Sequence, residues 1–262
     1  MEFNVKKHFE IDPEDLKNPI VLIGWPGIAL VGKLAIMTIR KSLKAEKFLS
    51  IEYYDFPAKA IVEKGKLHIP SAKVYYKKEE NNDFFILTAK FQPQEAESVY
   101  DFSKQFCIEM EKITKGKIKM YISAGALVSD KINEIPKVHV CGTDLDLVNE
   151  FLKIENTALM EEGVIAGANG ILPAWAGEKG FAPGICLLAE TLPPLPMMNL
   201  DPQASKAIVN VLIKKFNLSV DFEELDKKIK EMENVFESIK RQADIFMKRR
   251  AEEDKGIDSY FR

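Results

Sequence analysis

Short apolar runs alternate with longer amphipathic segments from Ile20 to about Phe216. A short apolar run bounded by turn residues is typical of a buried strand, whereas apolar positions three and four residues apart indicate a helix. The pattern predicts strands at residues 19–24, 47–55, 73–77, 83–91, 119–125 and 184–190. It predicts helices at residues 28–43, 94–113 and 202–216. Buried strands separated by helices favour a layered α/β/α domain with a largely parallel or mixed sheet.

A different pattern begins at Asp221. Apolar residues recur there at alternating intervals of three and four, with charged residues at most positions between them. This spacing is the a/d stripe of a long amphipathic helix. The stripe consists of Phe222, Leu225, Ile229, Met232, Phe236, Ile239, Ala243 and Phe246. The helix packs either on its own domain or between subunits, because both arrangements bury the same residues.

The last residues are aromatic. Gly256 is a suitable stop for the helix, and Tyr260 and Phe261 then precede Arg262 in a segment where polar residues are usual. The aromatic rings need a pocket, either on their own domain or on a partner. We therefore expect three regions, namely an α/β domain at residues 1–220, a heptad-patterned helix at 221–255 and a short flexible tail at 256–262.

Composition narrows the range of partners and compartments. The formal net charge of the 262-residue chain is −3, so neither nucleic acid nor another polyanion is an expected partner. No apolar run reaches the roughly 18 residues that span a bilayer, and the first residues lack a signal-peptide pattern. Three scattered cysteines predict neither a disulfide framework nor a zinc site. We expect a cytoplasmic protein without metal or cofactor, and its many Lys, Glu and Ile residues are typical of thermophiles.

Two glycine-rich segments are candidates for ligand binding. Gly24, Gly27 and Gly32 lie between a predicted strand and a predicted helix, where backbone N–H groups can bind phosphate. Their spacing fits neither G-x-G-x-x-G nor the P-loop, so close packing of helix against strand is the favoured explanation. Residues 163–184 hold six further glycines, which predict loops at the rim of a ligand site or subunit contact. Two aromatic residues in these loops could stack on a base or pack against a partner, Trp175 and Phe181.

Residues 136–144 contain a possible nucleophile and base. His139 and Cys141 are two residues apart, so on a strand they share a face. No oxyanion-binding group or orienting acid stands at a recognisable spacing, and a lone cysteine on an apolar strand is usually a small core residue. Three further carboxylates are not spaced as a catalytic pair: Glu178, Glu190 and Asp201. We assign no catalytic residue.

Four motifs follow one another over most of residues 18–216, namely GWPGIALVG, PKVHVCGTD, IAGANGILPAWA and DPQASKAIVNVL. In this order they resemble the successive motifs of the PAC2 family. The chain resembles in particular the archaeal homologues of the proteasome assembly chaperones. This resemblance implies a three-layer α/β/α sandwich similar to that of nucleoside phosphorylases and no catalytic activity. It also implies a cytoplasmic homo-oligomer that binds proteasome subunits.

The same resemblance implies a role for the tail. Several proteasome activators and chaperones carry a C-terminal hydrophobic–tyrosine–any motif, which enters pockets between neighbouring α-subunits of the core particle. Here Tyr260 takes the hydrophobic position, Phe261 the tyrosine position and Arg262 the free position. Phe261 departs from the motif because it lacks the phenolic hydroxyl. The ring supplies most of the buried area of a tyrosine, so docking is expected, whereas gate opening that needs the hydroxyl is not implied.

We therefore expect a non-enzymatic proteasome assembly chaperone homologue, a proteasome activator, or both, docked on α-subunits through the tail. One alternative is a phosphorylase- or hydrolase-like enzyme that uses the glycine-rich segments at residues 24–32 and 163–184. It requires a concave pocket with convergent polar groups and perturbed titratable residues. The other alternative is a structural coiled-coil oligomer with an inert tail.

Overall fold

A computed structural model describes residues 2–130, 134–193 and 200–234 of the protein. The chain divides into two compact units, Met1–Asp221 and Phe222–Arg262. In the second unit, residues 223–234 are helical. Several predicted site residues lie outside the described residues, namely Phe236, Ile239, Ala243 and Phe246 of the stripe and Tyr260, Phe261 and Arg262 of the tail.

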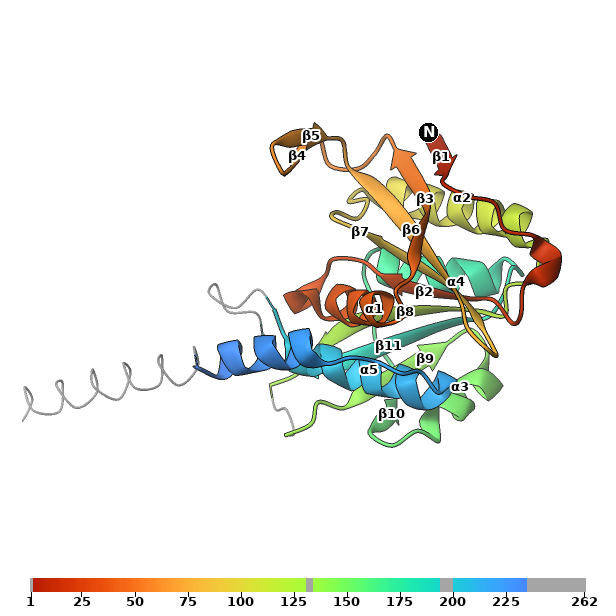
Figure 1. Cartoon of the computed structure of the whole chain (residues 1–262). Helices are drawn as coiled ribbons and strands as arrows, with labels where there is room; N and C mark the ends of the chain where they lie inside the picture. Colours follow the sequence, from red (N-terminus) through yellow and green to blue (C-terminus); the bar gives the residue numbers. More distant parts are fainter. Residues whose placement is uncertain (1, 131–133, 194–199, 235–262) are drawn as a thin grey trace, which may run out of the picture. The chain divides into compact units, whose positions relative to one another are not determined.

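A mixed sheet forms the middle layer of the first unit (Figure 1). Among the described residues it has nine strands in the order β1-β3-β6-β7-β2-β8-β11-β9-β10. Strands β7, β2, β8 and β11 are parallel, β1, β3 and β6 pair antiparallel, and β9 runs antiparallel to β11. The strands are β1 (Phe3–Lys7), β2 (Ile20–Gly24), β3 (Glu46–Tyr53), β6 (Ser71–Lys78), β7 (Asp83–Ala89), β8 (Met120–Val128), β9 (Val138–Gly142), β10 (Thr157–Leu159) and β11 (Gly184–Thr191). Two short strands pair as a separate hairpin, β4 (Ile61–Glu63) and β5 (Lys66–His68).

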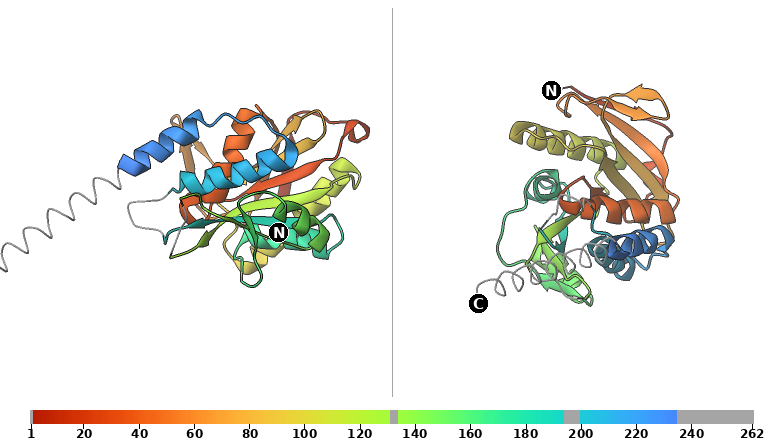
Figure 2. Two further views of the ribbon diagram at one scale, coloured as in Figure 1. Left: turned by 90° about the horizontal axis from the view of Figure 1, so that it is seen from below. Right: turned by 90° about the vertical axis from the view of Figure 1, so that its left-hand side faces the viewer.

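Helices cover both faces of the sheet, which confirms the predicted α/β/α sandwich (Figures 1 and 2). One face carries α1 (Val31–Ser42) and α5 (Pro202–Phe216), with α3 (Leu145–Leu152) beside α5, and the other carries α2 (Ala96–Thr114) and α4 (Ala168–Glu178). The 3-10 turns are η1 (Pro13–Asp15) and η2 (Ile28–Leu30). No helix in the described part of the chain is long and apolar enough to cross a membrane.

The helices on the two faces of the sheet determine which strand residues are buried. Every residue of β2 and β7 is buried, because helices pack on both faces of these central strands. Strand β6 alternates instead, with Ala72 and Val74 buried toward α2 while Ser71, Lys73 and Tyr75 on the opposite face are only half-buried. The α1-side face of this half of the sheet therefore stays partly open.

The strands and helices predicted between residues 19 and 216 are all present. The prediction of loops throughout residues 163–184 is wrong. Ala168–Glu178 forms α4, and Trp175 lies on this helix rather than in a loop. Small residues permit α4 to approach its neighbours closely, since a Cβ at Gly177 would collide with the Thr143 side chain. Tertiary packing thus overrides the low helix propensity of glycine and proline in this segment.

Candidate functional site

The two glycine-rich segments meet in a crevice at the carboxyl ends of β2 and β8. In open α/β sheets, ligands bind at this edge of the sheet. The crevice has a volume of about 530 Å³, with Gly27 and Gly32 on one side and Gly167 and Asn169 on the other. The structure therefore brings together two segments that the sequence singled out separately.

Two amide side chains join these segments. Gln92 Nε2 donates a hydrogen bond to the Pro26 carbonyl at 3.0 Å, and Gln92 Oε1 accepts one from the Ala168 N–H at 3.0 Å. Asn169 Oδ1 accepts a hydrogen bond from the Trp25 N–H at 3.3 Å. No local pattern singled out Gln92, because its partners are 66 and 76 residues away. These contacts turn both amides into structural cross-links of the crevice wall.

Gly24 and Gly32 serve close packing, which was the favoured explanation of the first segment. A Cβ at Gly32 would collide with the Ala124 backbone carbonyl of β8, so only glycine allows α1 to sit this close to the sheet. The turn before α1 is strained, because Ala29 and Leu30 both have positive φ values, 46° and 50°. The backbone here is shaped by the contact between helix and sheet.

The described lining of the crevice is apolar, with amide groups as its polar side chains. Its described lining contains glycines, apolar side chains and the amides of Gln92, Gln94 and Asn169, and none of these titrates. Acid–base or nucleophilic catalysis requires positioned titratable groups. Nor do the described residues hold a group of three His, Cys, Asp or Glu side chains placed to bind a metal ion. The crevice therefore offers no support for the phosphorylase- or hydrolase-like alternative.

His139 and Cys141 have separate partners and do not form a nucleophile–base pair. Both lie on β9, but His139 Nε2 is 3.0 Å from Glu190 Oε1. Cys141 lies directly across from Cys186 on β11, and the Ser123 hydroxyl is 3.3 Å from Cys186 Sγ. The sequence could not predict these pairs, because they depend on the register between β9 and β11.

The three cysteines differ in their thiol pKa. The hydrogen bond from Cys186 lowers the pKa of the half-buried Cys141 thiol, although burial opposes this. The same hydrogen bond, together with burial, raises the pKa of Cys186. Burial raises the pKa of Cys107 to about 12.

We expect Cys141 to react with iodoacetamide at least about ten times faster than the other two thiols, because thiolate fraction and access control the rate. The alkylation rate of a thiol rises as pH approaches its pKa. Because the pKa of Cys141 is lowered, its rate should rise at a lower pH than that of a free cysteine. Mass spectrometry of the native protein after timed alkylation measures this order. Cys141→Ser is the control and should leave only slow modification. Faster labelling of Cys107 or Cys186 would contradict the assignment.

The helical stripe is only partly placed. Phe222, Leu225, Ile229 and Met232 are among the described residues, within or next to the helix at residues 223–234. The remaining stripe positions and the predicted docking residues lie outside the described residues, so the tail stays a prediction.

Comparison with known proteins identifies the family. The model of the PAC2 family matches residues 21–240. The chain belongs to the PAC2 family. The uncharacterized protein MJ1210 of Methanocaldococcus jannaschii is 31% identical over 231 residues, which cover 88% of this chain and 86% of that one.

Two solved structures of Pyrococcus furiosus proteins share the PAC2 fold of this chain. PbaB, an archaeal proteasome activator, has a TM-score of 0.80 and 25% identity, covering 91% of this chain and 99% of PbaB. PbaA, an archaeal homolog of proteasome-assembly chaperone, has a TM-score of 0.71 and 22% identity, covering 99% of each chain. The likeness to PbaA concerns the fold alone.

Proposed function

We propose that this PAC2 protein binds the α-subunits of the proteasome core particle, as an assembly chaperone homologue, an activator, or both. The observation that carries the proposal is the similarity to the proteasome activator PbaB, which extends over 91% of this chain.

We place the docking element in the last three residues, Tyr260, Phe261 and Arg262. Two adjacent aromatic rings bury a large apolar area in a pocket, and short terminal segments are commonly captured in this way. One tail alone would bind weakly, because ordering a flexible segment costs conformational entropy that three side chains barely offset.

We propose that the protein is a homo-oligomer, in which several tails bind one proteasome ring together. Linked tails raise the effective concentration of each further contact, and the gain in affinity can reach about 10²–10⁴-fold. The apolar stripe that begins at Phe222 could hold the tails at a fixed spacing if it packs between subunits.

The tail is tested by binding of the full-length protein and of a chain ending at Ser259 to the purified core particle of the same organism. We expect the shortened chain to lose at least about a hundredfold in affinity, because every linked contact is removed. Surface plasmon resonance measures the binding, and peptide hydrolysis by the core particle measures activation.

Matched variants separate docking from gate opening. Phe261→Ala should weaken binding nearly as much as the shortening, whereas Phe261→Tyr restores the phenolic hydroxyl and should bind at least as well. A higher hydrolysis rate with Phe261→Tyr than with the unaltered chain would assign the hydroxyl to gate opening. Undiminished binding by the chain ending at Ser259 would refute tail docking and move the contact to the α/β unit.

A further inference from the structure

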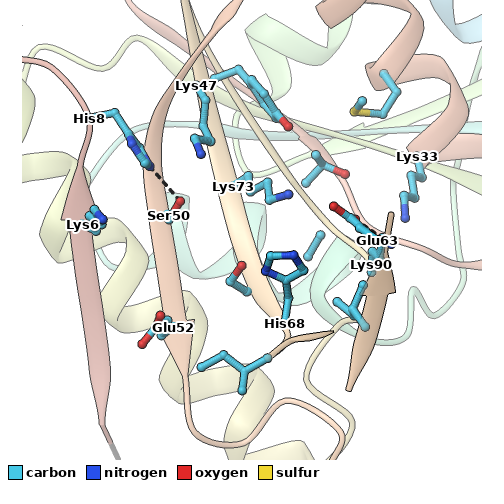
Figure 3. Close-up of a pocket in the computed structure, with 17 residues that line it drawn as sticks. Lys6, His8, Lys33, Lys47, Ser50, Glu52, Glu63, His68, Lys73 and Lys90 are labelled. Carbon is cyan, nitrogen blue, oxygen red and sulfur yellow. Dashed lines mark hydrogen bonds and ion pairs between the residues drawn. The ribbon is translucent and has the colours of Figure 1, made fainter. Parts of the chain in front are cut away.

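A second pocket lies on the opposite half of the sheet from the glycine-lined crevice (Figure 3). Its floor is the partly open face of β1, β3, β6 and β7, and α1 and the β4–β5 hairpin form its walls. The volume is about 570 Å³, within the range of small-molecule sites. Neither the motifs of the sequence nor the proposed proteasome contact accounts for this pocket.

The strand register places basic and hydroxyl side chains in one row across the floor. Lys6 pairs with Ser50, Ser50 with Lys73, and Lys73 with Thr88. Residues opposite one another on adjacent strands project to the same face, so all four side chains line the same pocket. On β3 and β6 this row alternates with core residues, which are Leu49 and Ile51 on β3 and Ala72 and Val74 on β6.

Positive charge predominates in the lining. Five lysines face two glutamates, and one of the glutamates, Glu63, is taken by Lys90 at 2.7 Å. The other four lysines have no ion pair with any described residue, and they are Lys6, Lys33, Lys47 and Lys73. The whole chain carries a formal net charge of −3, so this concentration of unpaired ammonium groups is a local feature of the fold.

Lys33 gives a second, independent observation that favours an anion in this pocket. It extends from the first turn of α1 toward the pocket and is half-buried (Figure 3). Burial, and then the nearby charge of Lys90, lower the pKa of its ammonium group. A partly buried cation without a counter-ion destabilises the folded protein, and a bound anion would relieve that cost.

We propose that this pocket binds a small polyphosphate, an anion that carries two or more linked phosphate groups. A net lining charge near plus three matches such a ligand, and lysine is a common point-charge partner of phosphate. The concave floor and limited volume favour a small molecule over an extended acidic protein surface. Met37, Ile61 and Ile69 add apolar surface to the lining, which suits an organic group attached to the phosphates.

The experiment is isothermal titration of the full-length protein with inorganic tripolyphosphate at low ionic strength. We expect a 1:1 complex per chain that weakens at least about tenfold between 50 and 500 mM salt, because side-chain ammonium groups are screened. The double variant Lys33→Gln, Lys73→Gln should weaken binding at least about tenfold, whereas Lys104→Gln, an exposed lysine on α2, is the matched control and should not change it.

Further ligands distinguish the source of the anion. ATP without magnesium should bind about as well as tripolyphosphate if an organic group is accepted, and sulfate should bind at least about tenfold more weakly because it has a single anionic centre. Binding of hexaglutamate in place of tripolyphosphate would overturn the proposal and make the pocket a peptide-docking site. Equal weakening by Lys104→Gln would also overturn it, since binding would then be non-specific attraction to the surface.

A thermal measurement guards against misfolded variants. Lys33→Met removes the half-buried charge but keeps an unbranched side chain, so its melting temperature without ligand should stay the same or rise by a few degrees, about 1–3 °C. The rise in melting temperature that tripolyphosphate causes in the unaltered protein should be clearly smaller in this variant. An undiminished rise in Lys33→Met would refute the role of Lys33 in binding.

Discussion

Gly32→Val is expected to prevent stable folding of the first unit. The position lies at the start of α1, and any Cβ there would collide with the backbone carbonyl of Ala124 in β8. Helix α1 cannot retreat without loss of core contacts, because Ala35, Ile36 and Ile39 of the same helix are fully buried. We expect the free energy of unfolding to fall by more than about 4 kcal/mol. This loss is larger than that of an ordinary core substitution, because the added side chain would collide with backbone atoms that cannot move aside.

Urea unfolding followed by far-ultraviolet circular dichroism measures this loss, and Gly27→Ala is the matched control. Gly27 lies in the same motif, its backbone is extended with φ of −156°, and a Cβ there meets only Asn169 Nδ2 at an ordinary 3.5 Å. Its substitution should change stability by less than about 1 kcal/mol. If Gly32→Val unfolded at the same urea concentration as the unaltered protein, close helix–sheet packing would not be the reason for this glycine.

Trp25→Ala is expected to destabilise the first unit by about 3–5 kcal/mol, the usual cost of removing a buried aromatic side chain. Trp25 is completely buried, with its ring centroid 5.1 Å from Phe102 and 6.3 Å from Phe56. These rings belong to the main core between the sheet and α2. The indole cannot serve as a stacking surface for a ligand, although it stands in a glycine-rich motif, because no part of it is exposed.

Trp175→Ala is the control for this second prediction. Trp175 is only half-buried and contacts Tyr100 at the edge of α2, so its removal should cost clearly less, about 1–2 kcal/mol. The chain has two tryptophans, and each variant therefore leaves the other as a fluorescent reporter of unfolding. A larger loss for Trp175→Ala than for Trp25→Ala would contradict the placement of the core.

At the candidate sites, the sequence predicts local motifs but not contacts between distant segments. The spacing of Gly24, Gly27 and Gly32 was enough to exclude the known phosphate-binding motifs, because those motifs are local. The spacing of His139 and Cys141 correctly predicted that they lie on one strand. It did not reveal that His139 contacts Glu190 and that Cys141 lies opposite Cys186. Both partners come from β11, about 45 to 51 residues further along the chain.

Charge shows the clearest difference between what the sequence and what the tertiary structure reveal. The formal net charge of −3 predicted that polyanions are unexpected partners, and this average holds for the chain as a whole. The lysines of the second pocket come from β1, α1, β3 and β6, which are separated by long stretches of sequence. An average over the chain cannot show that strand pairing gathers them around one concavity.

The sequence by itself determined the main strands and helices between residues 19 and 216 along the chain, the layered architecture and the PAC2 family. The helical stripe from Phe222 onward stays a prediction beyond residue 234. These features depend on periodicity and on motifs that neighbouring residues carry, so they are present before the chain folds. Only the tertiary structure decided that residues 168–178 form a helix, that Gln92 and Asn169 join the two glycine-rich segments, and that unpaired lysines meet on an open face of the sheet. Each of these depends on which distant segments pair and in which register, and no local pattern specifies that pairing.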